Sequence, residues 1–181
     1  GRRLSTEDLH TPNDKTFGIH NFTYDDSSNI ISETNQNGQV TNYSYDKLKR
    51  ILTEDFIGKN GIETTYSYDS CSIGMGKLCS VTSTNIITSY NYDQLGNIIK
   101  ENKKIENKDY STLFLYDWQG TLLTLTYPDK TQLNYIYEFN GKLKSIKNGN
   151  NYVVKNIDYS PMGAITKIEN ANGSVENNNF D

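Results

Sequence analysis

The chain has 181 residues, a formal net charge of −4 and only 34% hydrophobic residues, so it suits one domain or one repeat array and would fill a thick two-layer core with difficulty. Its 14 tyrosines separate it from disordered chains, which are poor in aromatics. The mild acidity without large Lys and Arg clusters disfavours a nucleic-acid surface, and no apolar run approaches the roughly 18 residues of a membrane helix.

The first 21 residues fit the rest of the chain least well. Gly1-Arg2-Arg3-Leu4 resembles the Gly–polar–aliphatic half of a later repeat, and the segment from Ser5 to Gly18 is expected to be irregular. No signal peptide is recognisable at this start. We therefore predict a partial first repeat with an irregular segment over residues 1–21, and tandem repeats over residues 22–181.

From Phe22 onward, a pair of aromatic residues one position apart recurs every 21–24 residues. A fixed period in this range indicates a repeat architecture. The repeats start near residues 22, 43, 66, 90, 114, 135 and 157, and a last one is cut off at 181. The signature positions are an aromatic residue, an acid directly after it and a Gly four residues after the aromatic: Tyr24, Asp25, Tyr45, Asp46, Tyr68, Asp69, Tyr92, Asp93, Gly96, Tyr116, Asp117, Gly120, Tyr137, Gly141, Tyr159, Gly163 and Phe180-Asp181.

Each repeat predicts two strands and two turns. The aromatic pair lies on one face of a strand because side chains alternate, Asp and Gly supply turn chemistry, and an aliphatic residue six positions after the tyrosine starts the return strand. The second turns are marked by Asn-Gly and Pro-Asp pairs, as at Asn37-Gly38 and Pro128-Asp129. In the fourth repeat, the charged residues 100–109 are expected to form a longer, exposed loop.

These strands predict an all-β protein: tandem β-hairpin repeats in a long, curled antiparallel ribbon, a segment of a β-shell or spiral. Most outward positions are polar, but Leu115 and Ile136 are apolar. Continuous apolar runs in strands indicate burial on both faces. We therefore expect residues 113–137 to pack against another turn of the spiral or another copy of the chain, with tolerated surface aliphatics as the alternative.

The third repeat contains an insertion, residues 71–79, with a cysteine at each end. On opposite arms of an enlarged hairpin tip, Cys71 and Cys79 could reach the roughly 5.5–6 Å Cα separation of a disulfide. Two free thiols are the alternative, and the redox compartment decides between them.

The repeat columns, in segments such as YNYDQLGNI and YSYDKLKRI, resemble YD repeats, also called RHS repeats. The resemblance covers nearly the whole chain from Phe22. It implies a piece of a secreted or cell-surface protein similar to bacterial RHS and wall-associated polymorphic toxins, toxin-complex components and teneurins, whose repeats wind into a hollow shell. It also implies that the partners are further repeats of a longer chain and a toxin or effector domain outside these residues. The family's Asp-Pro self-cleavage signature does not occur here.

No residues predict a catalytic, metal or cofactor site. The acids after the tyrosines come one per repeat, which is too few for Ca²⁺ because this ion needs six to eight oxygen ligands. We therefore interpret these acids as turn formers. His10 and His20 lack the further ligands or oriented base of a zinc or catalytic site. We therefore expect a non-enzymatic scaffold without cofactors. The alternative is a carbohydrate or cell-surface binding module that uses exposed aromatics, among them Trp118, the one tryptophan.

Overall fold

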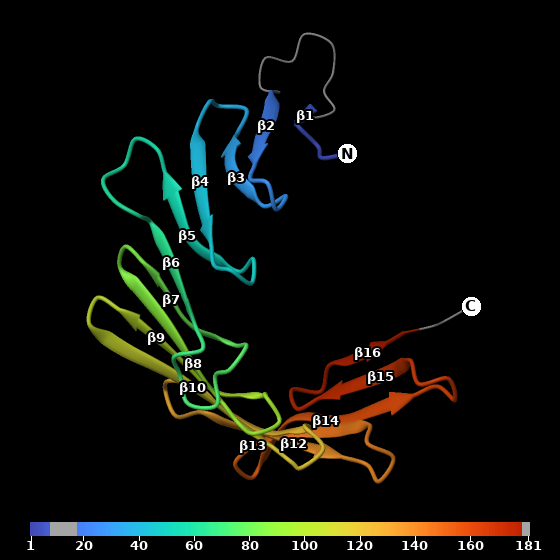
Figure 1. The fold of residues 1–181 in the computed structure, drawn as a ribbon. Helices are drawn as coiled ribbons and strands as arrows, with labels where there is room; N and C mark the ends of the chain where they lie inside the picture. Colours follow the sequence, from blue (N-terminus) through green and yellow to red (C-terminus); the bar gives the residue numbers. More distant parts are fainter. Residues whose placement is uncertain (8–17, 179–181) are drawn as a thin grey trace. The chain divides into compact units, whose positions relative to one another are not determined.

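The computed structural model describes residues 1–7 and 18–178, and over these residues the chain consists of antiparallel β-hairpins (Figure 1). Sixteen strands form a sheet in which the spatial order is the sequence order. The strands are β1 (Ser5–Glu7), β2 (Ile19–Tyr24), β3 (Ile30–Thr34), β4 (Val40–Tyr45), β5 (Ile51–Phe56), β6 (Thr64–Tyr68), β7 (Leu78–Ser83), β8 (Ile86–Tyr92), β9 (Ile98–Ile105), β10 (Lys108–Tyr116), β11 (Leu122–Thr126), β12 (Gln132–Tyr137), β13 (Leu143–Asn148), β14 (Asn151–Tyr159), β15 (Ile165–Asn170) and β16 (Val175–Asn177). The predicted all-β class of tandem hairpins is confirmed.

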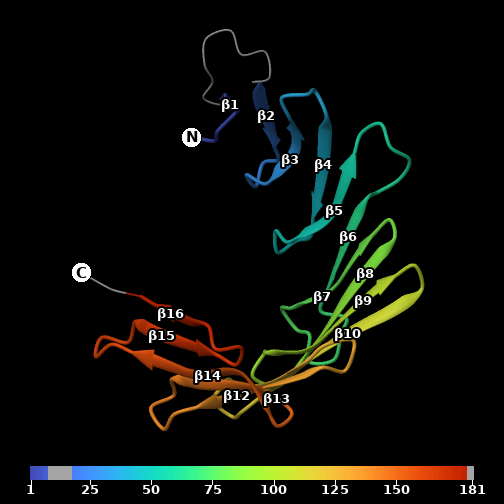
Figure 2. The same cartoon turned by 180° about the vertical axis from the view of Figure 1, so that it is seen from behind.

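The chain divides into two units, Gly1–Ser89 and Tyr90–Asp181, whose hairpins Figure 2 shows from behind. Several predicted features fall outside the described residues: His10, most of the expected irregular segment, and the final Phe180-Asp181. Within the described part of that segment, Ser5–Glu7 forms β1, which pairs with β2. No helix in residues 1–7 and 18–178 is long and apolar enough to span a membrane.

The strand boundaries coincide with the repeat columns. Seven even-numbered strands, β2 to β14, end at the repeated tyrosine, and the following strands begin at the aliphatic residue six positions later, or ten in the third repeat. Tyr45, for example, pairs with Ile51. Between that pair and Ser44–Thr53 one extra residue, Leu52, lies on the return strand, so the register shifts by a β-bulge. The same shift occurs beside Tyr24, Tyr68, Tyr116, Tyr137 and Tyr159.

The expected loop over residues 100–109 is wrong, because these residues form the long hairpin of β9 and β10. The two strands join through Glu106 and Asn107, whose φ angles of 48° and 65° make a two-residue turn. Opposite charges face each other across the pair at Lys104 and Asp109. Charge composition suggested a loop, whereas cross-strand complementarity and the Asn at the turn favour a hairpin.

The sheet is a single layer with little fully buried surface. Among the described hydrophobic residues only Cys79, Tyr92 and Ile157 are buried, while most strand residues are half-buried. Leu115 is 57% exposed and Ile136 half-buried. The packing of residues 113–137 against another ribbon or copy therefore stays a prediction.

Candidate functional site: the tyrosine turn edge and its disulfide loop

The turns after the repeated tyrosines close in the same way, except in the third repeat. In the second repeat the Asp46 backbone N–H donates to the Arg50 carbonyl at 2.9 Å, and the Lys49 N–H donates to the Asp46 carbonyl at 3.0 Å. Lys49 has φ 63°, in the left-handed region. This is a three-residue hairpin loop in which a turn is followed by a left-handed residue. Gly occupies that position in four later repeats and Ser28 in the first, with φ between 69° and 91°.

The carboxylate after the tyrosine accepts backbone hydrogen bonds inside this loop. Asp93 Oδ1 accepts from the Leu95 and Asn97 N–H groups at 2.9 Å, and Asp117 Oδ1 accepts from the Gln119 and Thr121 N–H groups at 2.9 and 2.8 Å. The side-chain amide of Asn97 holds the pKa of Asp93 below its usual value, and the Thr121 N–H does the same for the pKa of Asp117. The charged carboxylate thus stabilises the turn above pH about 4, and this contribution disappears as the pH falls through the lowered pKa.

In several repeats the hydroxyl of the repeated tyrosine bonds the repeat to the one before it. Tyr45 donates to the Ile30 carbonyl, Tyr137 to the Leu122 carbonyl and Tyr159 to the Leu143 carbonyl, each at 2.8 Å. In all three cases the acceptor is the first residue of the preceding repeat's return strand. Tyr24 donates in the same manner to the Arg3 carbonyl. The repeat columns placed the aromatic pair on one face of each strand, but they did not suggest this bond.

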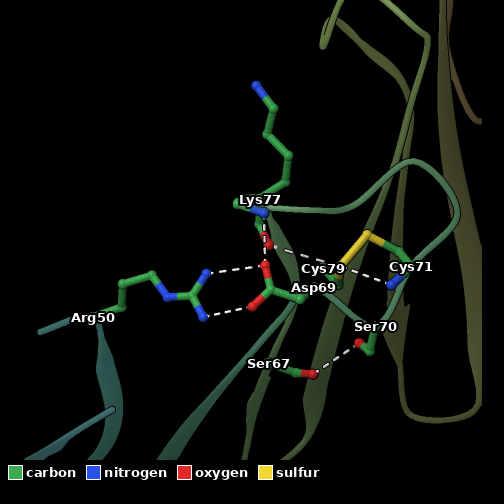
Figure 3. The surroundings of a disulfide bond; sticks show 8 residues. Arg50, Ser67, Asp69, Ser70, Cys71, Lys77 and Cys79 are labelled. Carbon is green, nitrogen blue, oxygen red and sulfur yellow. Dashed lines mark hydrogen bonds and ion pairs between the residues drawn. A yellow bond between two sulfur atoms is a disulfide. The ribbon is translucent and has the colours of Figure 1, made fainter. Parts of the chain in front are cut away.

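In the N-terminal unit, Arg50 forms ion pairs with the acids of two repeated turns. Arg50 Nε donates to Asp46 Oδ2 at 2.7 Å, and its terminal nitrogens donate to both carboxylate oxygens of Asp69 at 3.1 and 2.6 Å (Figure 3). Its guanidinium also lies over the Tyr68 ring, 4.4 Å from the centroid. The bidentate pair raises the pKa of Arg50 and, with the Gly76 N–H, lowers the pKa of Asp69. Arg50 therefore links the turns of two successive repeats.

The insertion of the third repeat forms a loop closed by a disulfide between Cys71 and Cys79, with a Cα separation of 5.4 Å (Figure 3). The Cys71 N–H points at Cys79 Sγ at 2.9 Å. Asp69 departs from the usual turn, because its φ is 63° and its carboxylate accepts from the Gly76 N–H at 2.7 Å. Closing so short a loop stabilises the fold by about 2–3 kcal/mol at most.

Gly74 lies buried behind the disulfide. A Cβ at this position would be 2.5 Å from Cys71 Sγ, 2.7 Å from the Cys71 carbonyl oxygen and 2.8 Å from Cys79 Sγ. Only glycine fits there without a shift of the loop. The disulfide and this glycine thus form one compact unit at the hairpin tip.

The remaining candidate residues, His20 and Trp118, lie in a strand and in a turn. His20 lies in β2, with Nδ1 3.3 Å from Glu33 Oε1 and Nε2 3.1 Å from Gln36 Oε1. Residues 1–7 and 18–178 contain no group of three or more His, Cys, Asp or Glu placed to hold a metal ion. Trp118 stands in a turn and is 81% exposed.

This geometry defines the class of protein: a tandem β-hairpin repeat protein whose hairpins close on Tyr-Asp turns and are joined by tyrosine hydroxyls. Residues 24–55, which contain two such turns, match the family model described as RHS Repeat. This match confirms the predicted resemblance to YD/RHS repeats for these residues. No curated protein matches the chain.

Several solved structures are similar to the chain in fold. The crystal structure of TcdB2-TccC3 has a TM-score of 0.75 at 14% identity, and that of TcdB2-TccC3-Cdc42 a TM-score of 0.74 at 14% identity. The Photorhabdus luminescens Tc holotoxin pore has a TM-score of 0.71 at 15% identity. Each comparison covers 91% of this chain, which spans only about a tenth of the length of those chains (9–10%).

Proposed function

We propose that the chain is a non-catalytic wall segment of a secreted or cell-surface YD/RHS-repeat shell. The observation that carries the proposal is that 91% of the chain has the fold of a stretch of the TcdB2-TccC3 structure, with a TM-score of 0.75. The repeat modules of this wall begin near residues 22, 43, 66, 90, 114, 135 and 157.

The construction of the sheet supports a wall. The repeats are joined by hydroxyl-to-carbonyl bonds such as that from Tyr137 to Leu122, so each repeat is stabilised mainly by its neighbours, as in solenoid proteins. A layer built this way is extended by adding repeats and needs no separate core. The signature tyrosines and acids would thus maintain the wall, and their substitution would affect stability.

The proposed partners are further repeats of the same longer chain and a toxin or effector domain that the shell encloses or presents. The name of one similar structure, a Tc holotoxin pore, supports a toxin context. The Cys71–Cys79 disulfide supports an oxidising, extracellular location, because disulfides persist there and are rare in the cytosol.

Electron microscopy and limited proteolysis of the natural polypeptide that contains these residues test the proposal. We expect a continuous hairpin-repeat wall around density that resists protease until the wall is opened by denaturant. A polypeptide whose repeats form no closed wall, and whose other domains are cleaved at the same rate with and without denaturant, would refute it.

A second candidate function is binding of surface glycans. Between the Trp118 turn and the next turn lies a hollow of about 340 Å³, lined by aromatic, carboxylate and amide side chains, among them Asp117, Gln119, Tyr135, Glu138 and Phe139. An aromatic platform beside such polar groups suits a sugar ring. A glycan array is the test: binding that Phe139→Ala abolishes, and that Tyr152→Ala retains, would favour this function.

A further inference from the structure

In the unit Tyr90–Asp181, each of four consecutive Tyr-Asp-type turns carries one large apolar side chain at its tip. These side chains are Leu95, Trp118, Phe139 and Met162, with exposures of 65%, 81%, 111% and 97%. Each stands between the turn's first residue, at the end of the tyrosine strand, and its left-handed glycine. The tips make no contribution to the closing hydrogen bonds beyond their backbone, so the turn itself does not require apolar residues.

The four tips lie along one edge of this unit. The strands follow one another in sequence order, so the turns after β8, β10, β12 and β14 all fall on the same side (Figure 2). Successive turns are two strands apart, a spacing of about 9.6 Å along the sheet. The unit therefore presents a regular row of apolar side chains, which we name the apolar tip row.

The opposite edge of the unit has a different composition. The residues at its turn tips are Glu106-Asn107, Pro128-Asp129, Gly149-Asn150 and Ala171-Asn172, and none carries an apolar side chain larger than proline. Two of these turns, at Pro128-Asp129 and Ala171-Asn172, close with the same pair of backbone hydrogen bonds as the tyrosine turns. At these two turns the difference in composition is not imposed by turn formation, and it indicates that the two edges meet different surroundings.

The chemistry of the tip row favours a protein occupant. Within the four turns the tip residues are uncharged, the other member of each pair being Gln94, Gln119, Asn140 or Pro161. The carboxylates of Asp93, Asp117 and Glu138 stand at the start of three of the turns and oppose an anionic lipid surface. Apolar groups with amides beside them match the uncharged centre of a protein–protein interface.

The area of the row suits a contact between two copies of the chain. Large aromatic side chains bury roughly 150–250 Å² each, so Trp118, Phe139, Leu95 and Met162 together offer on the order of 600–800 Å² on one copy. A standard interface buries roughly 800 Å² per partner. A two-fold contact brings the same row of each copy together, with matched spacing and no unpaired end, and it closes after two copies.

We propose that the apolar tip row of residues 90–181 is an association surface, and that two copies of this chain dock edge to edge through it. The contact uses side chains at the turn tips and leaves the exposed strands β1 and β16 unpaired. It is separate from the 113–137 strand face considered in the sequence analysis. It does not depend on an enclosed cargo.

Sedimentation equilibrium over a roughly hundredfold concentration range tests the proposal. The wild-type chain should dimerise, and W118S/F139S should weaken the dimer by roughly 10-fold or more, since buried aromatic anchors dominate interface energies. The matched control Y110S/Y152S removes two exposed aromatics from strand positions near the opposite edge and should change the dissociation constant by less than roughly twofold. A wild-type chain that stays monomeric, or a control that weakens the dimer as much as the tip variant, would overturn the proposal.

A second measurement tests the proposal even if the double variant W118S/F139S does not fold. Crosslinking of F139C with a short bis-maleimide should give covalent dimers, whereas Y152C should give none at the same concentration. Equal crosslinking of both variants would overturn the proposal. So would a monomeric wild-type chain that floats with phosphatidylcholine–phosphatidylserine vesicles and loses this binding in W118S/F139S, because the occupant would then be lipid.

Discussion

Replacing Tyr137 with Phe removes one hydroxyl and leaves the aromatic ring in place. The hydroxyl donates to the Leu122 carbonyl at 2.8 Å, and this bond joins the end of β12 to the start of β11. Burial is the main cause of the raised pKa of Tyr137, so the group stays a neutral donor at physiological pH. Tyr137→Phe therefore isolates the bond between repeats from the packing of the ring.

The expected loss is about 0.5–1.5 kcal/mol, the net contribution of one intramolecular hydrogen bond. We expect the lower half of that range, because Leu122 is only half-buried and its carbonyl can bind water after the substitution. For a chain of this size, 1 kcal/mol corresponds to about 2–4 °C in Tm. The expected decrease in Tm is therefore roughly 1–4 °C.

Urea unfolding and hydrogen exchange measured by mass spectrometry provide the assay. Exchange should accelerate in β11 and β12 and remain unchanged in distant repeats, because stability in repeat arrays is carried by nearest neighbours. The matched control is Tyr152→Phe, since Tyr152 is an exposed tyrosine whose ring lies 4.5 Å from Lys147 Nζ and keeps that contact as Phe. If Tyr137→Phe is as stable as Tyr152→Phe, or if exchange rises uniformly along the chain, the hydroxyl does not join the repeats.

Three further predictions follow from single contacts. Gly74→Ala should destabilise the disulfide loop by about 1–3 kcal/mol, because its Cβ would lie 2.5 Å from Cys71 Sγ; thermal unfolding with and without reductant should show a smaller loss after reduction, and an unchanged Tm in the oxidised protein would contradict it. Ser28→Gly should raise the free energy of unfolding by about 0.5–1 kcal/mol, since φ is 69° and non-glycine residues pay a steric penalty there; a lower free energy of unfolding in urea would argue against this. Burial and the hydrogen bond to Glu54 raise the pKa of Tyr66 to about 12, so the folded state favours the neutral phenol and its stability should fall as the pH rises above 10. Spectrophotometric titration should then find one tyrosine fewer ionising near pH 12 in Glu54→Gln, and identical titrations of the two proteins would show that the bond is unimportant.

The strand boundaries were predictable from the sequence because two residue types at a constant offset mark them. Tyr45 ends β4 and Ile51 begins β5, and the columns of tyrosine and aliphatic residues repeat this relation along the chain. The acid between them was expected to form the turn, and Asp93 does so by accepting the Leu95 N–H. Side-chain periodicity and turn chemistry are local properties, so a sequence carries them directly.

Contacts between repeats were not predictable in the same way. The bulge that inserts Leu52 and the bond from Tyr45 to the Ile30 carbonyl depend on how successive hairpins are staggered. A run of two apolar residues at the start of the return strand, as in Ile51-Leu52, is the signal that could have suggested the bulge. The bridge of Arg50 to Asp69 links residues in different repeats, and the sequence does not specify that distance.

In the turns that follow the repeated tyrosines, the residues that close the turn differ from the residues exposed at its tip. The carboxylate, the left-handed residue and the tyrosine hydroxyl satisfy the turn and join it to its neighbour, as Asp117, Gly120 and Tyr137 illustrate. None of these contacts involves the side chain at the tip, so the fold of one chain would tolerate any polar residue at Trp118 or Phe139. Large apolar side chains exposed to water at four consecutive tips weaken solubility and add nothing to the hairpin. These side chains stabilise the protein only when another surface covers them. The apolar tip row is therefore the part of this edge that indicates a partner, whereas the acids indicate only the turns.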